Sequence, residues 1–261
     1  MRLSWYRRFP RLTFLARRLA GANYEREMAL LGVLCDRAST GIDVGAKVGM
    51  YTYRIRDCSA DVLAFEPIPV FNKFLTTALG STRVRIEPFA LSRSVGSAVM
   101  RLPFDATGSP QFGRSTIDPA NPLAHALVAR TDELTVETRR LDDYKLAAVG
   151  FIKIDVEGHE LAVLDGAEAT IASHHPNLLI ECNDDHQPDA RKRLLAWLAE
   201  RDYTAMFLAG KEILDIEHYD RAAHWDKLVI ENVICLHRSR LPLRAELAAR
   251  AASARHWYPT S

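Results

Sequence analysis

Seven short apolar runs, each of a length suited to one strand, recur along the chain and are mostly separated by helical patterns. The segment IPVFNKFLTTAL follows the second run, for example, and RKRLLAWLAERD precedes the sixth. Such alternation is typical of a doubly wound α/β fold, in which helices cover both faces of a mainly parallel sheet. We therefore predict strands within residues 40–45, 61–67, 83–91, 150–158, 177–183, 203–209 and 227–238.

The alternation is interrupted once, between the third and fourth predicted strands, by residues 92–148. This stretch contains LPFDATGSPQFGRSTIDPANP, which is rich in Pro, Gly and Ser, and then the strand-like ELTVETRRLDDY. Loops of this length are usually functional or disordered. We predict an insertion over the substrate side in which residues 103–122 act as a lid that becomes ordered with the acceptor, with a plain surface loop as the alternative.

Composition is that of an ordinary globular protein, since 48% of the 261 residues are hydrophobic and 26% are charged. The formal net charge of +1 gives no general attraction to nucleic acid. The four cysteines are too far apart for a CxxC pair, which predicts reduced thiols and a cytoplasmic protein. No apolar run approaches the roughly 18 residues of a membrane span, and the start lacks the apolar stretch of a signal peptide.

The two ends of the chain differ from its middle. The first twenty residues hold six arginines, no acidic residue precedes Glu25, and an apolar stripe recurs at helical spacing through Trp5, Phe9, Leu12, Leu15 and Leu19. We interpret residues 1–37 as a basic helical extension that Pro10 is expected to interrupt. The simplest expectation is that its apolar stripe packs on the main domain; the alternatives are weak contact with an anionic membrane surface through residues 1–20, and a transit peptide.

Residues 239–261 predict a short Ala-rich helix followed by a loose end. Residues 38–238 then remain as the domain that carries the chemistry.

The first predicted strand ends in the motif IDVGAKVG, where Asp43 is followed by Gly45 and Gly49 in a turn before a helix. Glycine there lets the backbone approach a ligand closely, although a tight turn alone would also explain it. The second strand ends at Glu66, about where nucleotide-binding folds keep the acid that holds a ribose. The three-glycine fingerprint that cradles a pyrophosphate is absent, because Lys47 stands in the turn. This pattern favours a nucleoside cofactor without a pyrophosphate.

The second motif is GFIKIDVEGHELAVLDGA, residues 150–167, which reads as a buried strand followed by a helix. The strand ends near Asp155, because Gly158 breaks it ahead of the helix. If the first and fourth strands are neighbours, Asp155 and Asp43 meet at the switch point where open sheets bind ligands. Carboxylates crowded at such an edge repel one another unless a cation lies among them. A cofactor that carries positive charge would be such a cation.

The chain resembles the FkbM family of S-adenosylmethionine-dependent methyltransferases in the order of IDVGAKVGMYTYRI, VLAFEPIPVFNKFL, RRLDDY, FIKIDVEGHELAVLDGA and NLLIEC. The resemblance covers roughly residues 38–185, and it departs from the family at Lys47, where Asn is usual. It implies a Rossmann-like class I methyltransferase fold with seven strands, the last antiparallel, and O-methylation as the activity. The expected cofactor contacts are Asp43, Gly45, Ala46, Gly49, Glu66, Pro67, Ala90, Leu91 and Asp155.

The charged side chains after the fourth strand have several interpretations. Asp155 is the predicted general base or the group that orients the acceptor hydroxyl, with Glu157 and His159 as the nearest substitutes. Glu157 and Glu160 could instead favour the N-terminus of the helix, and Lys153 is interpreted as a structural ion-pair partner. No metal site is predicted, because no His/Asp constellation has recognisable metal spacing, although Asp155 on such an edge could ligate Mg²⁺.

These features predict an S-adenosylmethionine-dependent O-methyltransferase that acts on a hydroxyl of a sugar, glycan, glycolipid or secondary metabolite. That substrate class rests on the family resemblance alone. One alternative is a Rossmann-type nicotinamide-dependent oxidoreductase, against which the missing phosphate fingerprint argues. Another is a non-catalytic membrane-surface adaptor. Asp43, Glu66 and Asp155 argue against it, because a protein without a cationic ligand would gain nothing from three carboxylates that repel one another.

Overall fold

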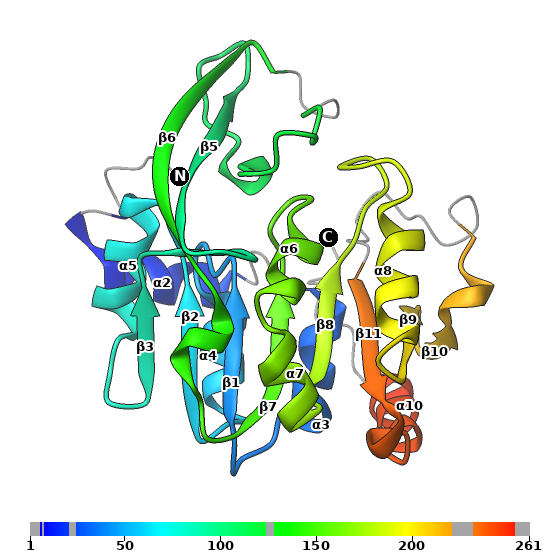
Figure 1. The fold of residues 1–261 in the computed structure, drawn as a ribbon. Coiled ribbons are helices and arrows are strands. Elements are labelled where there is room, and N and C mark those ends of the chain that lie inside the picture. The colour runs from blue at the N-terminus through cyan, green and yellow to red at the C-terminus, as the bar shows by residue number, and fades with distance from the viewer. Residues whose placement is uncertain (1–5, 7, 21–24, 124–127, 221–231, 254–261) are drawn as a thin grey trace.

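The computed structural model describes residues 6, 8–20, 25–123, 128–220 and 232–253. Its centre is a single sheet of eight strands in the order β10-β9-β11-β8-β7-β1-β2-β3 (Figure 1). The strands are β1 (Thr40–Val44), β2 (Asp61–Phe65), β3 (Val84–Glu87), β7 (Val149–Ile154), β8 (Asn177–Glu181), β9 (Tyr203–Ala209), β10 (Glu212–Asp215) and β11 (Asn232–His237). Strand β11 is antiparallel to both of its neighbours, whereas β3, β2, β1, β7 and β8 are all parallel.

This topology confirms the predicted doubly wound fold and its antiparallel last strand, but the sheet has eight strands where seven were predicted. Strand β10, which forms a hairpin with β9, was not predicted. The first part of the seventh predicted strand, residues 227–231, lies outside the described residues. The pairing of β1 with β7 sets Asp43 opposite Lys153 and brings the ends of these two strands together, as the motifs required.

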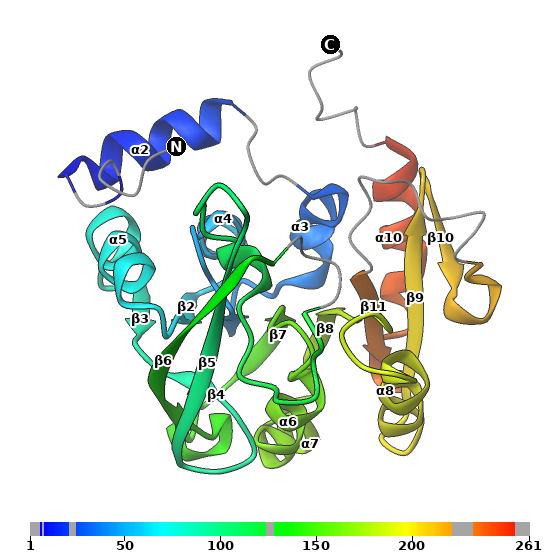
Figure 2. The same ribbon diagram turned by 90° about the horizontal axis from the view of Figure 1, so that it is seen from above.

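Burial of both faces explains the composition of the central strands. All six residues of β7 are buried, as expected for a parallel strand covered by helices on each side. One face packs on α3 (Leu31–Leu34), α4 (Met50–Arg56), α5 (Pro69–Leu79) and α10 (Leu243–Ser253), and the other on α6 (Glu160–Asp165), α7 (Glu168–His174) and α8 (Ala190–Ala199) (Figure 2). Helix α2 (Pro10–Leu19) lies outside this layer and packs on α5.

The N-terminal segment confirms one expectation and corrects another. Tyr6 and Arg8 are helical, Phe9 is not, and α2 begins anew at Pro10, so the helical pattern is interrupted there as predicted. Proline is tolerated at this position because the first turn of a helix makes no use of the N–H that proline lacks. The buried residues of α2 are Thr13 and Phe14, whereas the predicted apolar stripe faces outward, with exposed fractions of 42% for Phe9, 64% for Leu12, 43% for Leu15 and 74% for Leu19. The expectation that this stripe packs on the main domain is therefore wrong; Trp5 lies outside the described residues.

The insertion between β3 and β7 is a hairpin that rises above the carboxyl ends of the central strands (Figure 1). Its strands β5 (Gly96–Phe104) and β6 (Arg130–Arg139) form a second sheet with β4 (Ala90–Leu91). The predicted strand at residues 83–91 is split into β3 and β4, because Pro88 has no N–H to donate to a ladder.

The C-terminal segment contains the predicted helix as α10. It buries Leu247 and Ala251, and Arg250 Nε donates to the carbonyl oxygen of Ala29 at 2.9 Å. Residues 254–261, where a loose end was predicted, lie outside the described residues. The four cysteines form no disulfide in the structure. Among the described residues, no helix combines the length and the apolar character that crossing a membrane requires.

Candidate active site

A cavity that opens to solvent lies at the carboxyl edge of the sheet, beneath the insertion. Its walls come from the loops that follow β1, β2 and β7, and from the insertion itself. Much of the wall is apolar, and its charged residues are Lys47, Glu66, Asp155 and Glu157. Because β1 leads to β2 on one side and lies next to β7 on the other, the cavity is at the topological switch point where such sheets bind ligands.

The turn after β1 is shaped by close backbone contacts. Gly45 and Ala46 both donate their N–H groups to the carbonyl oxygen of Phe65, at 3.1 and 3.0 Å. Gly45 has a φ of +85°, and a Cβ at this position would collide with the carbonyl oxygen of Asp155. Asp155 in turn donates its N–H to the carbonyl oxygen of Val44 at 3.0 Å. Glycine at position 45 therefore allows the ends of β1 and β7 to approach each other.

Glu66 is fixed at the end of β2 by the turn. Its Oε2 accepts the N–H of Lys47 and its Oε1 accepts the N–H of Ile68, both at 2.7 Å. The residue is only 3% exposed, yet it lines the cavity, and burial raises its pKa to about 7. A carboxylate oxygen can accept more than one hydrogen bond, so Glu66 retains capacity for a hydroxyl donor.

Three of the predicted cofactor contacts do not line the cavity. Asp43 is 2% exposed and accepts a hydrogen bond from Thr52 Oγ1 at 2.5 Å, and burial raises its pKa to about 6. Gly49 caps α4 with a φ of +77°, and Ala46 is buried in the turn. The cavity lining does not include these three residues, which instead shape the turn. The other predicted site residues all line it: Gly45, Glu66, Pro67, Ala90, Leu91, Asp155, Glu157 and His159.

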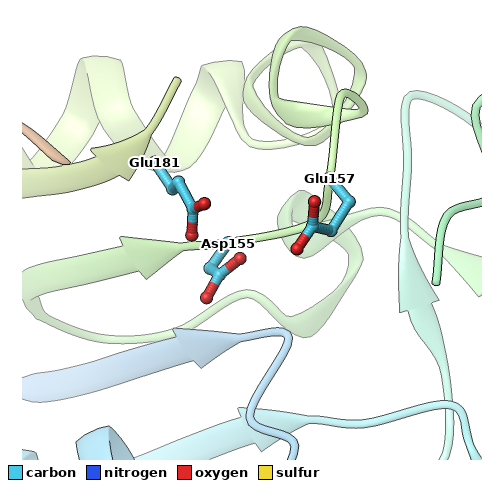
Figure 3. A group of neighbouring side chains, drawn as sticks. All are labelled: Asp155, Glu157 and Glu181. Atoms are coloured by element: carbon cyan, nitrogen blue, oxygen red, sulfur yellow. The ribbon is translucent and has the colours of Figure 1, made fainter. Parts of the chain in front are cut away.

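The carboxylates of Asp155, Glu157 and Glu181 converge beyond the end of β7 (Figure 3). One oxygen from each lies within 4.8 Å of the others, a spacing that could hold a metal ion. Burial, and then the charges of Asp155 and Glu157, raise the pKa of Glu181 well above its ordinary value. The sequence pointed to Asp155 as a ligand of such an ion, but the three-residue set depends on the approach of β7 to β8. Whatever occupies this position, the cluster favours positive charge.

The loop after β7 holds Glu157 in place. Glu157 has a φ of +56°, and its Oε2 lies 2.9 Å from His186 Nε2. Burial alone would lower the pKa of His186, but the hydrogen bond to Glu157 raises it. Glu160 Oε1 accepts the N–H of Gly158 at 2.9 Å in the first turn of α6, a contact that supports a structural role for Glu160. His186 was not predicted, because it lies in the polar loop after β8 and no spacing links that loop to residue 157.

His159 connects the site to the insertion. Its Nε2 lies 2.9 Å from Ser92 Oγ, and its Nδ1 lies 3.8 Å from Asp118 Oδ2. Burial lowers the pKa of His159, which favours the neutral imidazole. Asn121 Nδ2 donates to the carbonyl oxygen of Glu157 at 2.7 Å, so residues of the insertion contact both sides of this loop. Ser92, Asp118 and Asn121 were also missed, because their approach is set by the tertiary fold.

Lys153 lies behind the acidic cluster, within the sheet. It is 1% exposed, and its Nζ donates to Asn232 Oδ1 at 2.9 Å. Asn232 Nδ2 in turn donates to Glu25 Oε2 at 2.9 Å. Burial alone would lower the pKa of Lys153, but the charges of Asp155 and Glu25 raise it. These contacts support the interpretation of Lys153 as a structural cation.

The sheet order, the antiparallel last strand and the position of the cavity define a Rossmann-like class I methyltransferase fold. A family model described as the methyltransferase FkbM domain matches residues 43–205, which is more than half of the chain. The chain therefore belongs to the FkbM methyltransferase family.

Individual relatives are more distant. "Methyltransferase 1" of Beauveria bassiana (strain ARSEF 2860) is 28% identical over 166 residues, which cover 55% of this chain and 64% of that protein. The chain thus spans less than two-thirds of this relative. A crystal structure of methyltransferase FkbM from Methylobacillus flagellatus KT matches with a TM-score of 0.49 and 17% identity, over 77% of this chain and 44% of that one. A Streptococcus mutans protein in complex with SAH matches with a TM-score of 0.40 and 10% identity, over 80% of this chain and 93% of that one.

Proposed function

We propose that the protein is an S-adenosylmethionine-dependent O-methyltransferase that acts on a hydroxyl of a sugar, glycan, glycolipid or secondary metabolite. One observation carries the proposal: in a chain of the FkbM family, a single cavity joins a buried ribose-type acid, Glu66, to a group of acid–base residues at Asp155, Glu157 and His159.

The residues of the cavity fit this cofactor. Glu66 is suited to accept hydrogen bonds from ribose hydroxyls, and the apolar wall that includes Phe65 and Ile68 is suited to a flat purine. The convergence of Asp155 with Glu157 and Glu181 gives the other end a negative potential that favours a cation. When bound, S-adenosylmethionine supplies an electrophilic methyl group on a positively charged sulfur.

The remaining work is positioning and proton transfer, both of which the chain's own residues can perform. Asp155 accepts the proton of the acceptor hydroxyl or orients that hydroxyl for an in-line transfer. His159, whose pKa is lowered by burial, is neutral near pH 7 and is the second candidate base. The hydrogen bond from His186 fixes Glu157 beside the same position.

The direct test is mass spectrometry of cell extracts incubated with the full chain and S-adenosylmethionine labelled in its methyl group. We expect a glycan or metabolite to gain the labelled methyl, and the gain to be lost with the Asp155→Asn variant. Binding of S-adenosylmethionine without any labelled product in extracts rich in hydroxylated acceptors would contradict the O-methyltransferase assignment.

A further inference from the structure

Helix α2 displays an apolar face that no described part of the chain covers. Seven large hydrophobic side chains are exposed among the described residues, and four of them, Phe9, Leu12, Leu15 and Leu19, belong to this helix or its N-cap. At 100° per residue, the three leucines fall within an arc of about 60°. Contiguous exposed apolar surface of this kind marks an interaction site more often than scattered single residues do.

The opposite face of α2 is firmly attached to the domain, so the exposed face has a fixed orientation. Phe14 packs against Tyr53 of α4 and Phe74 of α5, with ring centroids 5.5 and 6.5 Å apart. Arg18 Nη1 donates to Tyr53 Oη at 2.6 Å, and Arg11 Nε donates to the carbonyl oxygen of Thr77 at 3.3 Å. Figure 2 shows α2 at the outer edge of the molecule, with α5 between it and the sheet.

Helix α2 and the two helices on which it packs carry charge of one sign. The three helices α2, α4 and α5 contain no acidic residue, whereas they carry six basic ones: Arg11, Arg17, Arg18, Arg54, Arg56 and Lys73. Asp57, the residue that follows α4, is paired with Arg56 at 3.1 Å. This concentration contrasts with a formal net charge of only +1 for the whole chain.

We propose that α2 docks the protein onto an anionic lipid surface. Leucines that enter the boundary between headgroups and acyl chains, flanked by arginines that reach the lipid phosphates, are the pattern of an interfacial amphipathic helix. Each basic residue near a negatively charged leaflet adds attraction, which screening by salt weakens. A second copy of the chain fits this face less well, because two such faces would bring like charges together.

Co-sedimentation of the full chain with vesicles tests the proposal. We expect binding to vesicles of phosphatidylcholine mixed with phosphatidylserine, weaker binding to phosphatidylcholine alone, and weakening as salt is raised. The variant Leu12→Gln/Leu15→Gln/Leu19→Gln should lose binding by at least about tenfold. Arg8, which precedes α2, and Lys73 of α5 are both exposed. Removal of charge by Arg8→Gln or by Lys73→Gln should cost roughly fivefold for each residue.

The matched control is Val95→Thr/Val99→Thr, which alters exposed apolar residues of the insertion and should bind vesicles like the wild type. Binding of S-adenosylmethionine should be unchanged in all of these variants, so the two proposals can fail separately. A wild type that stays in the supernatant with anionic vesicles, or a leucine variant that sediments as the wild type does, would overturn the proposal. So would a wild-type dimer that the leucine variant converts to a monomer without any effect on vesicle binding.

Discussion

Asp155 is the residue on which the proposed chemistry depends, because it lines the cavity and also belongs to the converging carboxylates. Replacing it with Asn keeps the shape of the side chain and removes its charge and basicity. We expect Asp155→Asn to fold, to bind S-adenosylmethionine and to transfer methyl groups at least about 10²-fold more slowly, the usual scale for loss of a general base. Single-turnover kinetics with labelled cofactor measure this, with the exposed Glu133→Gln as control.

Near-wild-type turnover of Asp155→Asn would reduce Asp155 to a structural carboxylate. Loss of folding would instead mean that Asp155 is needed to balance the charge of the buried Lys153.

Gly45 offers a test of how closely β1 and β7 must approach. Gly45 and Gly108 both have positive φ, +85° and +76°, but only at Gly45 would a Cβ meet another backbone atom. We expect Gly108→Ala to lower the free energy of unfolding by about 1 kcal/mol, from backbone strain alone. Gly45→Ala should lower it by at least about 2 kcal/mol more, because the strand ends must separate. Urea denaturation of both variants gives the comparison, and equal losses would mean that the contact with Asp155 relaxes freely.

Among the elements, the insertion is the one for which we predict a lid that becomes ordered when the acceptor binds. Arg101 Nη2 donates to the carbonyl oxygens of Asp118 and Asn121, and Asn121 contacts the loop at Glu157. We expect Asn121→Ala to raise hydrogen-exchange rates in residues 110–122, and acceptor binding to slow exchange in the wild type. Ser97→Ala, on an exposed part of the same hairpin, should change neither the exchange rates of the free protein nor their slowing by the acceptor. Exchange that is already slow in the free wild type would identify the segment as a rigid loop.

The sequence predicted helices and strands well where the apolar pattern and the residues that end an element, such as Gly and Pro, agreed. The apolar run before Asp155 predicted β7, and Gly45 and Glu66 marked the turn and strand end that form the cavity. The prediction that the apolar stripe of α2 packs on the domain was wrong, because helical spacing reveals such a stripe without showing which side of the helix contacts the domain. Contacts between separate loops, such as Glu157 with His186 or Asn121, were beyond prediction, since they depend on how the strands and the insertion come together.

At the scale of the whole molecule, buried carboxyl groups should make stability depend on pH. Burial, and then the charge of Glu25, raise the pKa of Glu27 from 4.5 to about 7. Since the folded-state pKa is the higher one, the stability that protonated Glu27 contributes is complete below pH 4.5 and is lost as the pH rises through 7. We expect Glu27→Gln to exceed the wild type in free energy of unfolding at about pH 8, by on the order of 1 kcal/mol or more, and to match it near pH 4. Urea denaturation at both pH values checks this, and an advantage independent of pH would contradict it.

Calorimetric titration of the full chain with S-adenosylmethionine, its demethylated product and NAD decides whether the cavity binds the proposed cofactor. We expect binding of the first two, no binding of NAD, and at least about tenfold weaker binding of the first two to Glu66→Gln, because a neutral amide is a poorer acceptor for ribose hydroxyls. The exposed Glu212→Gln, at the far edge of the sheet, should bind as the wild type does. Binding of NAD with no binding of S-adenosylmethionine would contradict the methyltransferase assignment.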